Sequence, residues 1–138
     1  MEPLACTVHA AMKARIQLCD SVCVIGDGPI ALLLAQLSLA AGATHVYVLG
    51  ILKRNLELAE QLGCIPLQRG PDAVQEVLRR TQGRGVDVTF EAVGVPVTFN
   101  QAMAVTRTVT YTHLKCTCFI LSMIGLGPRI RWPEHVSC

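Results

Sequence analysis

Short apolar runs alternate with helix-forming segments along most of this chain, and this alternation limits its fold more than any other feature. The apolar runs expected to form strands are 22–25, 45–49, 64–67 and 86–90. The segments expected to form helices are 4–19, 30–41, 55–62, 72–82 and 96–106. Because strands and helices alternate with short connections, the pattern predicts an α/β fold with a parallel sheet and right-handed crossovers.

Glycine, proline and aspartate mark several of the expected boundaries. Gly42 is expected to end the helix over 30–41, as a glycine just past a helix usually does. Pro96 suits the first turn of its helix, where no amide hydrogen is needed. Asp72 is expected to cap the helix over 72–82 with its side chain.

Length and composition exclude several classes of protein. A chain of 138 residues suits one domain, and 51% hydrophobic against 16% charged residues argues against disorder. Twelve Lys and Arg against ten Asp and Glu leave a net charge of +2, so no nucleic-acid partner is expected. No apolar run reaches the roughly 20 residues of a membrane span, and the N-terminus lacks a signal-peptide pattern. The expectation is a cytoplasmic protein with no membrane partner.

The seven cysteines and four histidines show no metal-binding spacing. An odd cysteine count argues against a disulfide framework, and no Cys-x-x-Cys occurs. The histidines lie far apart along the chain and match no zinc-ligand pattern. We therefore assign no metal ligand and no catalytic residue.

The sequence Gly26-x-Gly28-x-x-Ala31 directly follows one expected strand and opens the next helix. In that position it is a dinucleotide-binding fingerprint, which predicts a Rossmann-type sheet with helices on both faces. Gly26 permits the tight turn, Gly28 lets the backbone approach a pyrophosphate, and Ala31 lets the helix pack closely. Free amides at the helix start would bind the phosphates, which places Pro29 and Ile30 at the cofactor.

Two features of this turn leave alternatives open. Glycine turns between a strand and a helix also occur for purely structural reasons, so the turn can be a relic that binds nothing. Asp27 would place a carboxylate near the phosphates, which argues against binding. The alternative is that Asp27 points to solvent.

The end of the second expected strand indicates which nucleotide is bound. An NAD site usually has Asp or Glu there, about 20 residues after the turn, to hold the ribose hydroxyls. This chain has Gly50, followed by Lys53 and Arg54. A small residue followed by cations suits a 2′-phosphate, so NADP is favoured over NAD. The alternative is that both cations are solvated residues at a helix start.

Four ordered segments resemble the coenzyme domain of zinc-containing medium-chain alcohol dehydrogenases, in particular the sorbitol and threonine dehydrogenase branch. They are 2–5, 21–30, 56–63 and 83–94. The resemblance covers about 2–107 and implies part of an oxidoreductase. It also implies that Ala92, Val93 and Gly94 lie along the cofactor, and that Glu2 corresponds to a glutamate near the catalytic zinc.

The chain also departs from this family. The family's catalytic domain precedes the matching segment and supplies the zinc ligands, which this chain lacks. Zinc is therefore expected in intact relatives only, and no turnover is expected from this chain alone. Asn55 stands where the family usually has arginine, with Arg54 one place earlier. The sheet is expected to be incomplete on its C-terminal side.

These observations divide the chain into a nucleotide-binding domain over 1–107 and a divergent tail over 108–138, with one extra strand expected over 108–114. The first hypothesis is the dinucleotide-binding part of an oxidoreductase. The second is a non-catalytic dinucleotide-binding or dimerising module, forming a homo-oligomer or pairing with a full-length relative. The third is a chain that does not fold stably.

Overall fold

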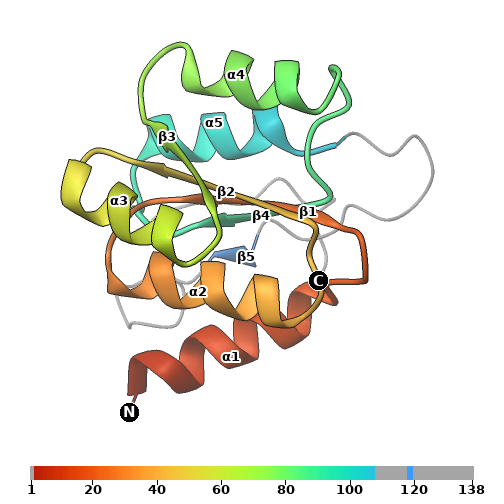
Figure 1. Cartoon of the computed structure of the whole chain (residues 1–138), viewed down its shortest axis with the longest axis vertical. Coiled ribbons are helices and arrows are strands. Elements are labelled where there is room, and N and C mark those ends of the chain that lie inside the picture. The colour runs from red at the N-terminus through yellow and green to blue at the C-terminus, as the bar shows by residue number, and fades with distance from the viewer. Residues whose placement is uncertain (1, 108–117, 120–138) are drawn as a thin grey trace.

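The computed structural model describes residues 2–107 and 118–119. Helices and strands alternate along the chain as the sequence predicts (Figure 1). The elements are α1 (Glu2–Ala14), β1 (Ser21–Ile25), α2 (Pro29–Ala40), β2 (His45–Gly50), α3 (Lys53–Gln61), β3 (Ile65–Gln68), α4 (Ala73–Arg80), β4 (Val88–Glu91), α5 (Pro96–Val105) and β5 (Cys118–Phe119).

The strands form one parallel sheet in the order β3-β2-β1-β4-β5, which confirms the predicted α/β, Rossmann-type class. The chain runs from β1 to β2 and then to β3 at one edge of the sheet. It then crosses over to β4, which pairs with the other side of β1. The register pairs Ile25 with both Leu49 and Glu91. The carboxyl ends of β1, β2 and β4 therefore meet where the strand order reverses, which is where ligands bind in open α/β sheets.

Helices cover both faces of the sheet, with α4 and α5 on one side and α1 and α2 on the other (Figure 1). Successive side chains of a strand point to opposite faces. Val22 and Val24 accordingly join a core cluster that includes Leu56 of α3, whereas Cys23 and Ile25 join the cluster under α4 and α5. A sheet buried on both faces explains why its strands are continuous apolar runs.

The first helix is shorter than the predicted 4–19. It ends at Ala14, and both Arg15 and Cys19 adopt the left-handed backbone conformation, with φ of 48° and 70°. A residue in that conformation cannot continue a right-handed helix. Leu18, which the predicted helix counted as apolar, is 83% exposed.

The other boundaries follow the prediction with two corrections. Gly42 follows the end of α2 with φ of 99°, as expected. Asp72 stands before α4, but its side chain makes no capping hydrogen bond. A capping side chain needs an extended backbone, and Asp72 is already helical. Val86 lies before β4 and pairs only in an isolated bridge with Thr106.

The strand predicted over 108–114 lies outside the described residues. Of the predicted tail, the structure describes only β5, which pairs with β4. Across 2–107, no helix is long and apolar enough to span a bilayer.

Candidate functional site

Gly26 forms a tight turn between β1 and α2 at the reversal point of the sheet. Its φ is 128°, and its amide donates to the Leu49 carbonyl at 2.8 Å. A Cβ at this position would lie 3.3 Å from Val93 Cγ2 and 3.5 Å from the Cβ atoms of Ala31 and Ala92. Glycine is therefore needed here for its backbone conformation and for the close approach of the loop after β4.

Gly28 leaves open space at the start of α2. Its backbone is ordinary, with φ of −75° and ψ of 175°, but no atom lies within 4 Å of where a Cβ would be. No side chain caps this helix, which begins at Pro29, and the Ile30 side chain packs into the core. An uncapped helix start facing open space fits a phosphate, because its amides and dipole favour an anion.

Asp27 is partly exposed, but its carboxylate does not extend freely into solvent. Its Oδ2 accepts hydrogen bonds from the amides of Ile51 at 2.9 Å and Leu52 at 2.6 Å. Its main-chain carbonyl accepts a hydrogen bond from Asn55 Nδ2 at 2.8 Å. Asp27 thereby ties the turn after β1 to the turn after β2, and its carboxylate lies at the start of α3, where a negative charge is favourable.

Gly50, the buried last residue of β2, lies directly against Asp27. A Cβ on Gly50 would lie 2.5 Å from Asp27 Cβ, so no larger residue fits without movement. The two cations predicted to contact the nucleotide lie on the first turn of α3. The Lys53 side chain is 91% exposed, with its Nζ 3.8 Å from Glu57 Oε1, and Arg54 is exposed.

Glu91 organises the loop after β4. It is 1% exposed, and its Oε1 accepts hydrogen bonds from the amides of Val93 at 2.8 Å and Gly94 at 2.9 Å. The Thr98 hydroxyl lies 2.9 Å from the same oxygen. Oε2 is buried and has no partner among the described residues. The carboxylate thus holds the loop against the Gly26 turn.

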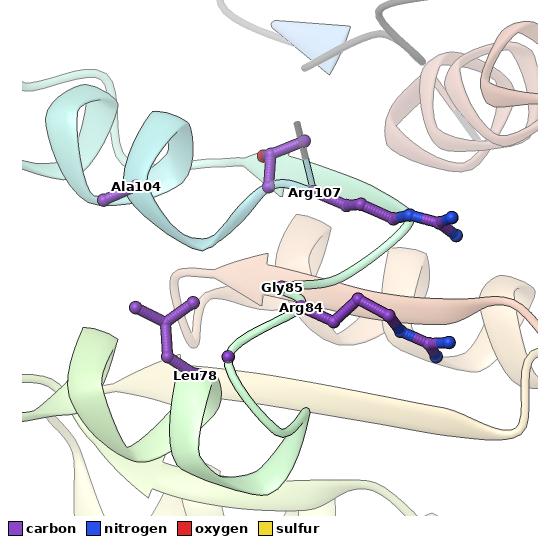
Figure 2. Close-up of a pocket in the computed structure, with 7 residues that line it drawn as sticks. Leu78, Arg84, Gly85, Ala104 and Arg107 are labelled. Carbon is purple, nitrogen blue, oxygen red and sulfur yellow. The ribbon is translucent and has the colours of Figure 1, made fainter. Parts of the chain in front are cut away.

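A pocket of 460 Å³ lies elsewhere, between α4, α5 and the segment that leads into β4 (Figure 2). Its lining residues are Leu78, Gly83, Arg84, Gly85, Ala104, Thr106 and Arg107. Figure 2 shows the side chains of Arg84 and Arg107 extending in the same direction. Arg107 Nη1 lies 3.3 Å from Asp87 Oδ1 at the amino end of β4. The pocket therefore lies at the amino ends of the strands, whereas the Gly26 turn lies at their carboxyl ends.

The described residues provide little for metal or nucleophilic chemistry. Among them, no group of three or more His, Cys, Asp or Glu side chains is arranged to hold a metal ion. Burial raises the pKa of the Cys23 thiol to about 12 and also raises the pKa of Cys64. Neither is a thiolate near neutral pH. The side chain of Glu2 lies outside the described part of the chain.

The structure thus brings together Gly26, Gly28, Gly50 and the loop over 92–94. Asp27 is the residue whose contribution the sequence interpretation missed. The available signal was a glycine where the strand end usually carries an acid, together with an acid inside the glycine turn. Lys53 and Arg54 lie on the first turn of α3 with exposed side chains, and their contact with a nucleotide stays a prediction.

Comparison with known proteins agrees with this geometry. Residues 29–109 match the family described as Zinc-binding dehydrogenase. The chain is 39% identical over 105 residues to (R,R)-butanediol dehydrogenase of Bacillus subtilis strain 168, covering 75% of this chain and 30% of that protein. It is 31% identical over 109 residues to sorbitol dehydrogenase of the same strain, covering 78% of this chain and 31% of that protein.

Solved structures give the same result. The crystal structure of 2R,3R-butanediol dehydrogenase from Bacillus subtilis matches with a TM-score of 0.72 at 39% identity, covering 77% of this chain and 31% of that chain. A protein described as a zinc-binding dehydrogenase from Sinorhizobium meliloti 1021, bound to NADP, matches with a TM-score of 0.67 at 32% identity. The match covers 76% of this chain and 32% of that chain.

The chain spans about 30% of the length of the curated relatives named here. The matched segment runs from the start of α2 past the end of α5, and so includes most of the Rossmann-type sheet. Since this segment is more than half of the 138 residues, the chain belongs to the zinc-binding dehydrogenase family.

Proposed function

We propose that this chain is the nicotinamide-dinucleotide-binding part of an oxidoreductase that resembles zinc-dependent alcohol and polyol dehydrogenases. The observation that carries the proposal is the uncapped start of α2, which faces open space beside Gly28 at the reversal point of the sheet. A pyrophosphate needs such a group of free amides with no side chain in front of it.

The residues around the turn fit the other parts of a dinucleotide. The amides of Ile30 and Ala31, which follow Pro29 in the first turn of α2, would hold the pyrophosphate. The strand end at Gly50 would receive the adenosine ribose. The loop over 92–94, which Glu91 holds against Gly26, would lie along the cofactor as it does in the family. When bound, the nicotinamide ring supplies hydride transfer, and the protein supplies binding and orientation.

The nucleotide's identity depends on the charges at the end of β2. The sequence favours NADP because Lys53 and Arg54 follow Gly50, and that preference stays a prediction. The Lys53 ammonium lies near Glu57, and the Asp27 carboxylate lies against Gly50. The ribose end of the site is thus where NAD and NADP would be distinguished.

The test is a comparison of two glycine variants of the full chain. Gly28→Ala would place a methyl group where the pyrophosphate is expected, without backbone strain. We expect NADH and NADPH to raise the wild-type Tm, with about 2.7 kcal/mol of stabilisation at 100 times the dissociation constant. Gly28→Ala should lose most of this shift while melting cooperatively.

The matched control is Gly70→Ala. Gly70 also has no atom within 4 Å of a Cβ position, but it lies in the loop after β3. This variant should keep the full nucleotide-dependent shift. A wild-type chain that melts cooperatively but responds to neither nucleotide would contradict the proposed function.

The zinc-dependent step of the relatives is not assigned to the described residues of this chain. We expect no oxidation of sorbitol or threonine by the purified chain with added zinc and either nucleotide. Measured turnover under these conditions would contradict this expectation.

We also propose a cytoplasmic location, because free thiols such as Cys6, Cys19, Cys23 and Cys64 suit a reducing compartment.

A second candidate function is a non-catalytic module that pairs with a second copy or a full-length relative. The observation that favours it is the apolar surface of α1, where Leu4, Val8 and Met12 are 45%, 37% and 72% exposed. Contiguous exposed apolar surface often marks an interface. Light scattering after size exclusion tests this candidate, and a monomer at all concentrations would count against self-association.

A further inference from the structure

Asp27 fills the space that a side chain at the end of β2 would otherwise take. A Cβ on Gly50 would lie 2.5 Å from Asp27 Cβ and 2.8 Å from both Asp27 Cγ and Oδ2. The end of this strand is where a dinucleotide-binding sheet normally presents the acid that holds the adenosine ribose. This chain therefore has a carboxylate at that place, supplied by the glycine turn instead of by β2.

The carboxylate is held in position by backbone amides. Oδ2 accepts from Ile51 at 2.9 Å and Leu52 at 2.6 Å, and Asn55 Nδ2 donates to the Asp27 carbonyl at 2.8 Å. Within the described residues, Oδ1 accepts no hydrogen bond. An ionised carboxylate accepts several hydrogen bonds, so Oδ1 has capacity for a ribose hydroxyl.

The same contacts disfavour a 2′-phosphate at this strand end. Such a phosphate needs hydrogen-bond donors, and the amides of Ile51 and Leu52 already donate to Asp27. It would also lie beside a second negative charge. Of the two predicted cations, Lys53 has a side chain that is 91% exposed and an ammonium 3.8 Å from Glu57, and Arg54 is exposed.

We propose that Asp27 determines which nucleotide this chain binds, by accepting the adenosine 2′-hydroxyl of NAD(H) and excluding the 2′-phosphate of NADP(H). This inference rests on the proposed function, because it requires a dinucleotide at the Gly26 turn. It reverses the preference for NADP that Lys53 and Arg54 indicate in the sequence.

The experiment measures the dissociation constants of NADH and NADPH for the full chain by cofactor fluorescence. Wild type should bind NADH at least about 10-fold more tightly than NADPH, which corresponds to about 1.4 kcal/mol. Asp27→Asn keeps the size of the side chain and removes its charge. It should bring the two dissociation constants to within about threefold, mainly through tighter binding of NADPH.

Two further variants separate the local effect from a change in net charge or folding. Asp72→Asn removes the same charge from an exposed residue whose side chain does not cap α4, and it should keep the wild-type ratio. Asp27→Ala also frees the amides of Ile51 and Leu52, and it should favour NADPH further. Thermal melts followed by circular dichroism show whether each variant is folded, and the wild-type ratio tests the proposal without any variant.

The outcomes distinguish the two proposals. A wild-type chain that binds NADPH as tightly as NADH, or more tightly, would overturn the role of Asp27 and leave the proposed function intact. An unchanged ratio in folded Asp27→Asn would also overturn it. A folded chain that binds neither nucleotide would overturn the proposed function, and the specificity proposal with it.

Discussion

Substituting Gly50 with alanine tests whether Asp27 occupies the space at the end of β2. The backbone of Gly50 is not in the left-handed region, so alanine introduces no backbone strain. The added methyl group would instead lie 2.5 Å from Asp27 Cβ, far inside normal van der Waals contact. Because the nearest atom is Cβ itself, a change of Asp27 rotamer cannot relieve the clash, and the two turns must separate.

Overpacking of this kind costs about 1–3 kcal/mol. At roughly 4 °C per kcal/mol for a chain of this size, Gly50→Ala should lower Tm by about 4–12 °C. Asp27→Gly alone loses the hydrogen bonds to Ile51 and Leu52, and should cost about 1–2 kcal/mol. Asp27→Gly also removes the Cβ that clashes with the methyl group introduced by Gly50→Ala. The double variant, Asp27→Gly with Gly50→Ala, should therefore be about 1–3 kcal/mol more stable than the sum of the two single effects predicts.

The assay is urea unfolding of the wild type, both single variants and the double variant, followed by circular dichroism. Gly70→Ala is the control, because it has open space around its Cβ position and should change stability by less than about 1 kcal/mol. Additive effects within about 0.5 kcal/mol would refute the contact between Asp27 and Gly50. A Gly50→Ala variant as stable as wild type would refute it too.

Two further predictions concern titrating groups. Burial of Asp87 opposes its ionisation, but hydrogen bonds from Ser21 and Arg107 outweigh this effect and lower its pKa from 3.8. Its stabilising contribution is therefore present above pH 3.8 and lost as the pH falls further, so the stability gap of about 2 kcal/mol to Asp87→Asn should close below that pH in urea titrations. Cys19 is exposed and Cys23 fully buried, with its pKa raised to about 12. Alkylation of the native chain followed by peptide mapping should label Cys19 and spare Cys23, and equal labelling would contradict the buried position.

The sheet could be predicted from the sequence because its signals are local. Each strand is a continuous apolar run, and residues such as Gly42 mark helix ends through their own backbone preference. The errors arose where local preference did not decide the conformation. Arg15 takes a left-handed conformation that its residue type does not favour, and Asp72 adopts a helical backbone that prevents side-chain capping.

The site was predictable in part for the same reason. Gly26 and Gly28 lie within one short motif, and the tight turn at Gly26 and the open space at Gly28 follow from the turn that the motif makes. The contact of Asp27 with Ile51 and Leu52 joins residues 24 and 25 positions apart. Nothing local to the motif indicates that contact, which depends on how β1 and β2 bring their carboxyl ends together. Gly50 therefore indicated a missing acid, whereas the structure has the Asp27 carboxylate lying against Gly50.

The central place of β1 has a consequence for synthesis of the chain. The amide of Ser21, at the start of β1, donates a hydrogen bond to the Asp87 carboxylate, 66 residues later, and one edge of β1 pairs with β4. At 5–20 residues per second, a ribosome needs roughly 3–13 s to make the intervening segment. During that interval the nascent chain presents an apolar, unpaired strand edge, which is the kind of surface that chaperones protect and that aggregates form from. Ribosome-bound nascent chains that end before β4 should therefore need chaperones more than nascent chains that include β4.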